Sequence, residues 1–282
     1  MIEKLASQYP VYQLCLAFEV TRSGYYAWFK GQETPRQAAN RALMTEIGRI
    51  HQEKRGRYGS PRMTAQLRQE GHRCNHKRVE RLMRQHGLRG RSSRKRRVCT
   101  TNSDHHHPIA PNLLKGRAAP TRPNEVWVAD ITYIPTAEGW VFLAAVMDLY
   151  SRQILGWSVW ESLEAGGAMQ ALKRALVNRG YPTDVIHHSD RGVQYACCAY
   201  RQELKDRGLV ASMSRRGNCY DNAAMEAFWS TLKREAMNDS ATWSKNRVRR
   251  ELFEYIESTY NRGRLHSSLG YQSPVDFENQ NS

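Results

Sequence analysis

The stretch VIHHSDRGVQY, residues 185–195, changes from apolar to polar after its first two residues. Val185 and Ile186 are β-branched, and such residues favour a buried strand. Gly192 favours a turn that ends this strand. The strand therefore presents Asp190 at its tip, where the carboxylate either caps the next helix or holds a ligand that needs a carboxylate.

The segments on either side of this stretch predict a layered α/β domain. Three apolar segments precede it in quick succession, which indicates an antiparallel meander. Helix and strand patterns then alternate toward the C-terminal end. The expected strands are 126–134, 139–150, 153–160, 184–188 and 209–214, and the expected helices are 166–180, 198–208, 221–237 and 243–261. This order, βββαβαβα, is typical of an α/β layered domain.

The first ninety residues predict short helices. Residues 9–30 are expected to form two of them. Within residues 40–90, Ser60 is placed to cap a helix that has Pro61 at its first position, and Asn75 can cap the next helix. These two helices have apolar side chains at helical spacing, which are Met63, Leu67, Val79, Leu82 and Met83. Both segments have the size of a helix-turn-helix module.

The net charge of +16 lies almost entirely in the first part of the chain. Residues 1–110 hold 22 Lys and Arg against 8 Asp and Glu, whereas residues 111–282 hold 21 against 19. A strongly basic segment indicates a polyanionic partner. The asymmetry argues against the alternative that the charge serves solubility alone.

The densest basic stretch coincides with the second predicted helix-turn-helix. Residues 73–97 hold eleven Lys and Arg against a single acid, Glu80. Helix-turn-helix modules place their second helix in the major groove of DNA, with basic residues toward phosphate. The expected DNA contacts are Lys77, Arg78, Arg81 and Arg84. A solvated basic helix in a helical bundle is the alternative interpretation.

Other classes of protein fit the sequence poorly. No run of about 18 apolar residues occurs, and the N-terminal stretch lacks the apolar core of a signal peptide, which predicts a cytoplasmic protein. The six cysteines form no C-x-x-C pair, so neither a disulfide framework nor a cysteine-rich zinc site is expected. His105, His106 and His107 are adjacent, which favours an exposed loop over a metal site.

Three carboxylates of the α/β part stand out by position. Asp130 lies in the middle of the first strand, where aspartate is disfavoured and a buried carboxylate is costly. Glu226 lies on a predicted helix and shares a face with Trp229 and Lys233. Between the acids lie 59 residues before Asp190 and 35 residues after it. Taken singly, each acid fits a structural or surface role better than a functional one.

A set of carboxylates without a His or Cys cluster favours a hard cation. Mg²⁺, with Mn²⁺ as a substitute, suits such oxygen ligands better than zinc does. Two ions about 4 Å apart can clamp the attacking and leaving oxygens of a phosphoryl displacement, and three acids can hold both if one carboxylate bridges. Such a site explains acids in a protein that binds DNA, because without metal they would repel the substrate.

Several long motifs resemble a single bacterial family. They are RYGSPRMTAQLRQEGHRCNHKRVERLMRQHGL, WVADITYIPT, GWVFLAAVMDLYSRQILGW, HHSDRGVQY, SMSRRGNCYDNAAMEAFWSTLKRE and YNRGRLHSSLGYQSP. In this order they resemble insertion-sequence transposases, specifically the second-reading-frame product (OrfB) of the insertion-sequence-three family. The resemblance covers nearly the whole chain. It implies an α/β, ribonuclease-H-like integrase core preceded by small all-α helix-turn-helix segments.

The resemblance extends to the domain boundaries and to the acids. The family's signature is two aspartates and a glutamate with 35 residues before the glutamate, and Asp130, Asp190 and Glu226 match these three catalytic and metal-binding positions. Lys233 matches a basic residue that contacts the DNA end in related enzymes. The expected units are a helix-turn-helix-like segment at 1–35, a basic helix-turn-helix domain at 40–96, a linker at 97–122 and the catalytic core at 123–282.

Other residues of the matched motifs have weaker expectations. Arg191 is a candidate DNA contact. For His187 and His188, packing or DNA contact is favoured over a role as general base or ligand. Asp148 and Asp221 are interpreted as support or capping residues.

The activity that the resemblance implies is DNA transposition. Water cuts one strand at an end of the element, and the freed 3′-hydroxyl then attacks another phosphodiester. A DNA-binding regulator without catalysis is one alternative, and it leaves the three acids unexplained. A simple ribonuclease-H-like nuclease is another, and it would cut strands without joining them. The implied partners are terminal-repeat and target DNA, further copies of the chain, and an upstream-frame product (OrfA).

Overall fold

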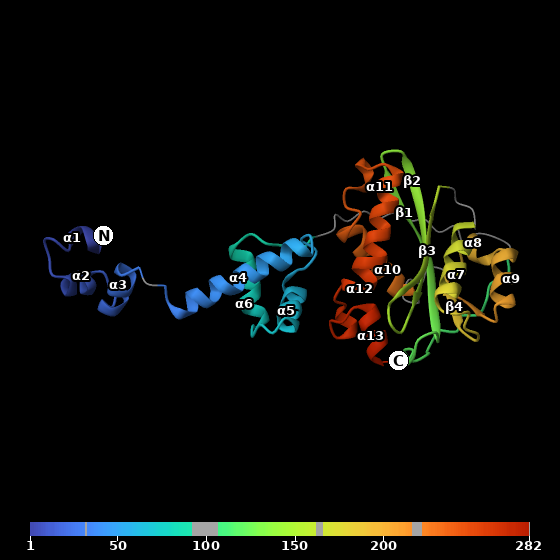
Figure 1. The fold of residues 1–282 in the computed structure, drawn as a ribbon, viewed down its shortest axis with the longest axis horizontal. Helices are drawn as coiled ribbons and strands as arrows, with labels where there is room; N and C mark the ends of the chain where they lie inside the picture. Colours follow the sequence, from blue (N-terminus) through green and yellow to red (C-terminus); the bar gives the residue numbers. More distant parts are fainter. Residues whose placement is uncertain (32, 92–106, 162–165, 216–221, 282) are drawn as a thin grey trace.

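A computed structural model describes residues 1–31, 33–91, 107–161, 166–215 and 222–281. Figure 1 shows an α/β core formed by the C-terminal half of the chain, with helices of the N-terminal part beside it. Among the described residues, no helix combines the length and the apolar character that a membrane span requires.

The core is built on a five-stranded sheet with the strand order β3-β2-β1-β4-β5. Its strands are β1 (Val126–Thr136), β2 (Gly139–Asp148), β3 (Ile154–Trp160), β4 (Ile186–Ser189) and β5 (Val210–Met213). The first three pair antiparallel, as predicted, while β4 pairs parallel to β1 and β5 parallel to β4. This mixed sheet is the ribonuclease-H-like arrangement that the resemblance implied.

Helices cover both faces of the sheet (Figure 1). One face carries α7 (Gly166–Asn178), α8 (Val193–Ala196) and α9 (Cys198–Asp206), and the other carries α10 (Ala223–Glu235) and α11 (Lys245–Phe253). Alternate residues of β1 separate the two layers: Trp127 and Ala129 pack in the α7–α9 layer, whereas Val126 and Val128 pack in the α10–α11 layer. Because side chains alternate along a strand, Asp130 points to the α10 side.

Two groups of helices precede the core. The first contains α1 (Ile2–Leu5), α2 (Val11–Ala17) and α3 (Arg22–Phe29), and the second contains α4 (Pro35–Glu53), α5 (Ser60–Gln69) and α6 (His76–Gln85). The apolar positions predicted for α5 and α6 are all buried, together with Leu43, Ile47 and Ile50 of α4. Asn75 caps α6 as predicted, since its Oδ1 accepts a hydrogen bond from the Arg78 N–H at 2.8 Å.

One predicted cap is wrong. Ser60 is the first residue of α5, and no side chain caps that helix. The Ser60 hydroxyl instead lies 3.1 Å from His76 Nε2, so it joins α5 to α6. Asn222 precedes α10 without a capping bond, and its Nδ2 donates to the Ala129 carbonyl of β1 at 3.4 Å. Asp221, which was interpreted as a support or capping residue, lies outside the described residues.

The predicted helix at 243–261 is divided. The segment η2 (Ser240–Thr242) precedes α11, and α11 continues into the wider π-helical turns of η3 (Glu254–Tyr260). The chain ends with α12 (Asn261–Gly263), η4 (Ser267–Leu269) and α13 (Pro274–Asn281). His105, His106 and residues 97–104 of the predicted linker lie outside the described residues.

The C-terminal segment joins the α4–α6 unit to the core. Leu265 is buried within the hydrophobic cluster of α4–α6. The Tyr58 hydroxyl donates to the Gly263 carbonyl and accepts from the Leu265 N–H, both at 3.1 Å. The basic helical unit is therefore packed against the α/β core through residues about 200 positions away in sequence.

Candidate active site

Asp130 lies on β1, and Asp190 lies just after the neighbouring parallel strand β4. β1 and β4 pair with Val126 opposite Ile186 and Val128 opposite His188. Extending this register by two residues places Asp130 next to Asp190, just after β4 ends. Neighbouring strands lie about 4.8 Å apart, so the two carboxylates lie at the same end of the two strands.

Each carboxylate oxygen of Asp130 accepts a hydrogen bond. The Ile131 N–H donates to Oδ1 at 2.8 Å, and the indole N–H of Trp229 donates to Oδ2 at 2.9 Å. Burial and the negative charges of Asp190 and Glu226 nevertheless raise the pKa of Asp130 to about 7. The three acids are therefore close enough to repel one another.

The helix α10 brings the third acid to the two strands. Glu226 lies in its first turn, on the exposed side of the helix. Trp229, one turn later, is buried and holds α10 to β1 through its bond to Asp130. Burial lowers the pKa of Lys233, and the charge of Asp130 opposes this shift, so the ammonium also lies near the acids. The predicted common face of α10 is thus directed at the two aspartates.

A tight turn positions Asp190 between β4 and α8. Its Oδ1 accepts a hydrogen bond from the Gly192 N–H at 2.9 Å. A Cβ at Gly192 would approach both Asp190 Oδ1 and Gln194 Oε1 to 3.0 Å, so a larger residue would displace these oxygens. Ser189 donates to the backbone carbonyl of Asp190 at 3.0 Å and so supports the turn instead of the carboxylate. Asp190 both stabilises the turn before α8 and faces Asp130.

Known proteins match this chain along nearly its whole length. Residues 38–97 match the family described as HTH-like domain, and residues 120–219 and 207–274 match two families described as Integrase core domain. The chain is 39% identical to the transposase InsF of insertion sequence IS3A from Escherichia coli strain K12, over 99% of this chain and 98% of that protein. The chain belongs to the insertion-sequence transposase family.

Another curated protein and several solved structures are also similar to the transposase. It is 43% identical to the "Insertion element IS600 uncharacterized 31 kDa protein" of Shigella sonnei, over 94% of this chain and 97% of that protein. Among solved structures, the simian T-cell lymphotropic virus intasome aligns with a TM-score of 0.48 and 14% identity, over 82% of this chain and 74% of that chain. The HTLV-2 integrase catalytic core in complex with magnesium aligns with a TM-score of 0.43 and 13% identity, over 56% and 97%.

The two histidines before Asp190 are packing residues of the transposase. His187 and His188 are both buried. The Tyr200 hydroxyl lies 3.1 Å from His187 Nε2, and Ser212 Oγ lies 2.8 Å from His188 Nδ1. Burial, with a contribution from His188, lowers the pKa of His187 to about 4, so this ring is neutral near pH 7. Of the two roles that were favoured, packing or DNA contact, the burial of both rings fits packing.

Asp148 also supports the fold, as expected. Its side chain is fully buried at the end of β2. It accepts hydrogen bonds from the backbone N–H groups of Asn124 and Tyr150 at 2.8 Å and of Ser151 at 3.3 Å. Burial raises the pKa of Asp148, and these three bonds oppose the shift. This carboxylate organises the turn that follows β2.

The predicted DNA contacts of α6 have different environments in the transposase. Lys77 and Arg84 are exposed. Arg78 is half-buried and donates from Nε to Asn40 Oδ1 at 2.8 Å, which links α6 to α4. Arg81 is half-buried, and its Nε is buried without a hydrogen-bond partner among the described residues. The helix thus presents two exposed basic side chains, Lys77 and Arg84, and two half-buried ones, Arg78 and Arg81.

Arg191, the other predicted DNA contact, braces the turn that contains Asp190. Its Nε donates to the Ser214 carbonyl at 2.7 Å, which connects the turn to the residue after β5. The side chain is half-buried in this position. Arg191 therefore stabilises the turn that contains Asp190, whether or not it also contacts DNA.

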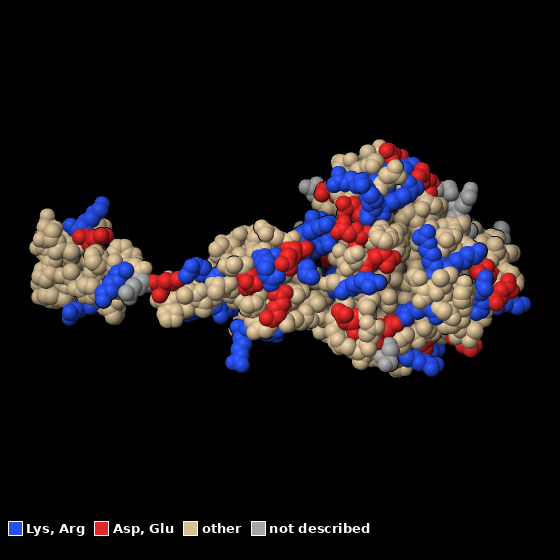
Figure 2. Space-filling model, in the orientation of Figure 1, with Lys and Arg blue, Asp and Glu red and all other residues tan. Residues whose placement is uncertain are grey.

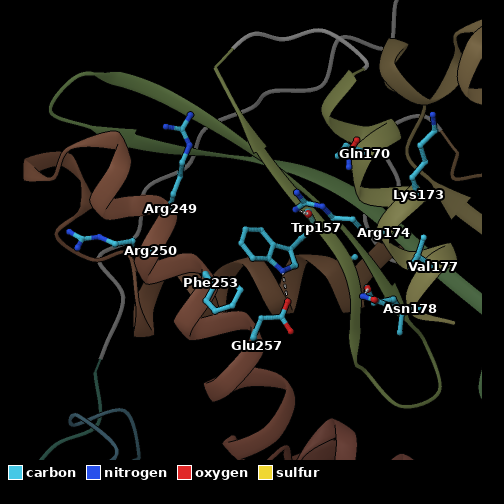
Figure 3. Close-up of a pocket in the computed structure, with 12 residues that line it drawn as sticks. Trp157, Gln170, Lys173, Arg174, Val177, Asn178, Arg249, Arg250, Phe253 and Glu257 are labelled. Atoms are coloured by element: carbon cyan, nitrogen blue, oxygen red, sulfur yellow. Dashed lines mark hydrogen bonds between the residues drawn. The ribbon is translucent and has the colours of Figure 1, made fainter.

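A groove of about 720 Å³ lies away from the three acids, beside the edge strand β3. Figure 3 shows Trp157 and Phe253 in this groove with basic side chains of α7 and α11 around them. Arg174 donates to the Trp157 carbonyl at 2.7 Å, and Asn178 donates to the Leu155 carbonyl at 2.8 Å. Side chains of α7 thus occupy backbone acceptors of the edge strand.

Proposed function

We propose that Asp130, Asp190 and Glu226 catalyse DNA cleavage at the ends of the insertion sequence and the joining of the freed 3′ ends to target DNA. The observation that carries this proposal is the proximity of Asp190 and Glu226 to Asp130. Asp130 lies on β1, Asp190 lies just after the neighbouring parallel strand β4, and Glu226 lies on a helix that is hydrogen-bonded to Asp130 through Trp229. Among the described residues, the group of acid and histidine side chains whose ligand atoms all lie within 4.8 Å of one another, Glu46, Glu70 and His72, belongs to the α4–α6 unit and not to the sheet.

The donor set suits Mg²⁺, with Mn²⁺ as a substitute. The three ligands offer only carboxylate oxygens, which hard divalent cations prefer. Burial and the charges of Asp190 and Glu226 raise the pKa of Asp130, and a bound cation would relieve the repulsion between these carboxylates. We infer that Asp130, Asp190 and Glu226 would together hold two such ions, because Asp130 lies beside Asp190 through the pairing of β1 with β4 and is joined to the helix of Glu226 through Trp229. When bound, the ions activate the attacking oxygen and neutralise charge on the leaving oxygen.

The chain's own groups prepare the site for this chemistry. The bonds from Ile131 and Trp229 fix both oxygens of Asp130 before any ligand binds. Such preorganisation avoids the cost of ordering the carboxylate during the reaction. Lys233 lies on the same face of α10 as Glu226 and is positioned to hold a phosphate of the DNA end.

The helical units would deliver the DNA. Lys77 and Arg84 are exposed on α6 and are proposed to contact phosphates, with Arg78, Arg81 and Arg191 as further contacts. The proposed units are the helix-turn-helix-like segment at 1–35, the basic domain at 40–96, the linker at 97–122 and the core at 123–282. Joining two ends of one element requires at least two copies of the chain on DNA. We also propose an upstream-frame product (OrfA) as a partner, and the cytoplasm as the place of action.

The decisive experiment is cleavage and joining of labelled DNA that contains the element's own ends. Reactions would contain Mg²⁺, Mn²⁺ or EDTA, with wild type, Glu226→Gln and the control Glu203→Gln on α9. We expect metal-dependent nicked and joined products from wild type and Glu203→Gln, and a loss of at least about a thousandfold from Glu226→Gln. Binding without cleavage under all conditions would favour a DNA-binding regulator. Cleavage without joined products would favour a simple nuclease, and activity unchanged by Glu226→Gln would refute the three-acid site.

A further inference from the structure

A second cleft, of about 570 Å³, opens where the α4–α6 unit meets the core. Its basic lining consists of Arg62, Arg117, Arg152, Arg264 and His266, and no Asp or Glu is among the described residues that line it. These residues come from α5, the segment before β1, the turn after β2 and the C-terminal segment. Figure 2 shows Lys and Arg side chains on the surface around this junction.

The catalytic helix forms one wall of this cleft. Ala223, Ala227 and Thr231 line it from α10, and Glu226 precedes Ala227 on the same helix. Small side chains allow a bulky group to approach the helix closely, and Thr231 adds a hydroxyl. The cleft therefore adjoins the three-acid site while remaining separate from it.

Most of the basic residues in the cleft already have partners. Arg264 and Arg62 bind the carboxylate of Glu235, and Arg117 binds Glu125. The guanidinium of Arg152 makes no hydrogen bond or ion pair with any residue that the structure describes. Because the side chain is half-buried, burial lowers the pKa of Arg152, which shows that its charge lacks full hydration. The charge of Asp148 opposes this shift, but its carboxylate forms no ion pair with Arg152. A half-buried cation without an ion-pair partner among the described residues favours the binding of an anion.

The backbone holds Arg152 in place for such a ligand. Its φ is +62°, a left-handed conformation that is uncommon for arginine. Its N–H donates to the Asp148 carbonyl at 2.9 Å, in the turn that the Asp148 carboxylate organises. Such strain costs of order 1 kcal/mol and persists where the surroundings enforce it, often at functional sites.

The pKa of the nearby His266 is affected by the same positive charges. His266 lies in the cleft with its Nδ1 2.9 Å from Ser268 Oγ. Burial, followed by the charges of Arg264, Arg152 and Arg62, lowers the pKa of His266 to about 4. The ring is therefore neutral near pH 7 and can donate one hydrogen bond from Nε2 if Ser268 donates to Nδ1.

We propose that this cleft binds a backbone phosphate of the DNA substrate, with Arg152 as its main ligand and His266 and Thr231 as further donors. The inference rests on the proposed function, because it assigns a second contact to the same DNA. Duplex held by the α4–α6 unit must cross this junction to reach the acids, since the cleft has one wall from α5 and another from α10. DNA is therefore favoured over a free phosphate ion as the natural ligand.

The test measures DNA binding in EDTA, so that cleavage plays no part. The variants are Arg152→Gln, which removes the proposed ligand, and Ala227→Glu, which adds a negative charge at an exposed position of the wall. Lys205→Gln and Ala199→Glu on α9 are the matched controls, because they change the same charges at exposed positions on the opposite face of the sheet. Thermal unfolding confirms that each variant is folded.

We expect both cleft variants to raise the Kd for end DNA about tenfold near 0.1 M salt, while the controls change it less than about twofold. The slope of log K against log salt should fall by about one for Arg152→Gln, as for the loss of one phosphate contact. A scan of the DNA with single neutral methylphosphonates then locates the contact. At one position the methylphosphonate should weaken the binding of DNA by wild type, but it should not weaken binding by Arg152→Gln any further.

The outcomes separate this inference from the proposed function. Affinity and slope that are equal for Arg152→Gln, Ala227→Glu and their controls would overturn the cleft, even if metal-dependent cleavage persists. A scan in which every position affects wild type and Arg152→Gln equally would overturn it as well. Conversely, coupling at one phosphate without any cleavage activity would support the cleft and refute the catalytic proposal. If wild type binds no DNA, both are refuted.

Discussion

The indole N–H of Trp229 donates to Asp130 Oδ2 at 2.9 Å and thereby joins α10 to β1. The helix that carries Glu226 is thus attached directly to the strand that carries Asp130. This bond sets the spacing between two of the three acids without the help of a cation. Groups that orient metal ligands in this way usually affect metal affinity strongly.

Trp229→Phe should weaken the response of the transposase to metal. The phenyl ring preserves most of the buried surface, but Asp130 loses one of its two hydrogen-bond donors. We expect the Mg²⁺ concentration for half-maximal cleavage to rise about 10-fold to 100-fold, which is typical for the loss of an outer partner. Metal titrations of the cleavage rate would measure this shift.

The matched control is Trp157→Phe. The Trp157 indole donates to the Glu257 carboxylate at 2.7 Å in the groove beside β3, away from the acids (Figure 3). It therefore loses the same kind of bond at a site without a proposed role in catalysis. Equal metal responses of the two variants would contradict a specific role of Trp229.

The metal-free protein should lose stability as the pH rises toward neutrality. The pKa of Asp130 is raised from its ordinary value of 3.8 to about 7, so between these values the folded state binds more protons than the unfolded state. The free energy of unfolding contributed by this group therefore falls as pH increases from about 4 to about 7. Asp130→Asn should abolish cleavage and yet raise the melting temperature in EDTA at pH 8 relative to wild type.

Thermal unfolding of both proteins at pH 5 and pH 8 would check this prediction. Each kcal/mol by which Asp130→Asn is more stable than wild type corresponds to an increase of about 2–4 °C in melting temperature for a protein of this size. Saturating Mg²⁺ should raise the melting temperature of wild type at pH 8 but not that of Asp130→Asn. A wild-type protein that is less stable than the variant by the same margin at both pH values would argue against titration of Asp130.

The groove beside β3 makes a separate prediction about self-association. β3 lies at the edge of the sheet, and an edge with free carbonyl groups can pair with another chain. Arg174 and Asn178 occupy two of these carbonyls. Replacing both by alanine should destabilise the fold by about 1–3 kcal/mol and produce concentration-dependent oligomers.

Sedimentation velocity over a range of concentrations would detect such oligomers. Lys173→Ala is the control, because Lys173 lines the same groove (Figure 3). It removes a charge from the groove while the bonds of Arg174 and Asn178 stay in place. Oligomers formed equally by Lys173→Ala would point to lost charge repulsion instead of an open strand edge.

The sequence predicted the strands and the acids because both depend on local patterns. Each of the five strands begins and ends within two residues of its predicted bounds, since short β-branched runs and glycine turns define them. Asp130 was conspicuous as an acid inside such a run. Its bond to Trp229 was not predictable, although the position of the indole one helical turn after Glu226 was a usable signal.

Contacts between distant segments were the features that sequence patterns could not supply. The insertion of Leu265 into the core of α4–α6 depends on how two units pack, and nothing near Leu265 indicates it. The Ser60 cap failed for the same reason, because His76 of the next helix competes for the hydroxyl. The role of Arg264 in binding Glu235 is likewise visible only in three dimensions.

Glu235 provides the last prediction, because it connects the catalytic helix to the α4–α6 unit. Its buried carboxylate accepts two bonds from Arg264 Nε and Nη2, and one from the Tyr255 hydroxyl at 2.8 Å. Its backbone carbonyl accepts from Arg57 at 3.4 Å and from Arg91 at 3.0 Å. Burial alone would raise the pKa of Glu235, but the bond and charge of Arg264 lower it overall.

Glu235→Gln should therefore leave Arg264 buried without its counter-charge and cost about 3–5 kcal/mol of unfolding free energy. Urea unfolding at pH 7 would measure the loss, and limited proteolysis after residue 91 would show whether the α4–α6 unit separates from the core. The double variant Glu235→Met with Arg264→Met should regain most of the stability, because it removes both charges together. If the double variant is as unstable as Glu235→Gln, packing of the side chain, and not the ion pair, holds the two units together.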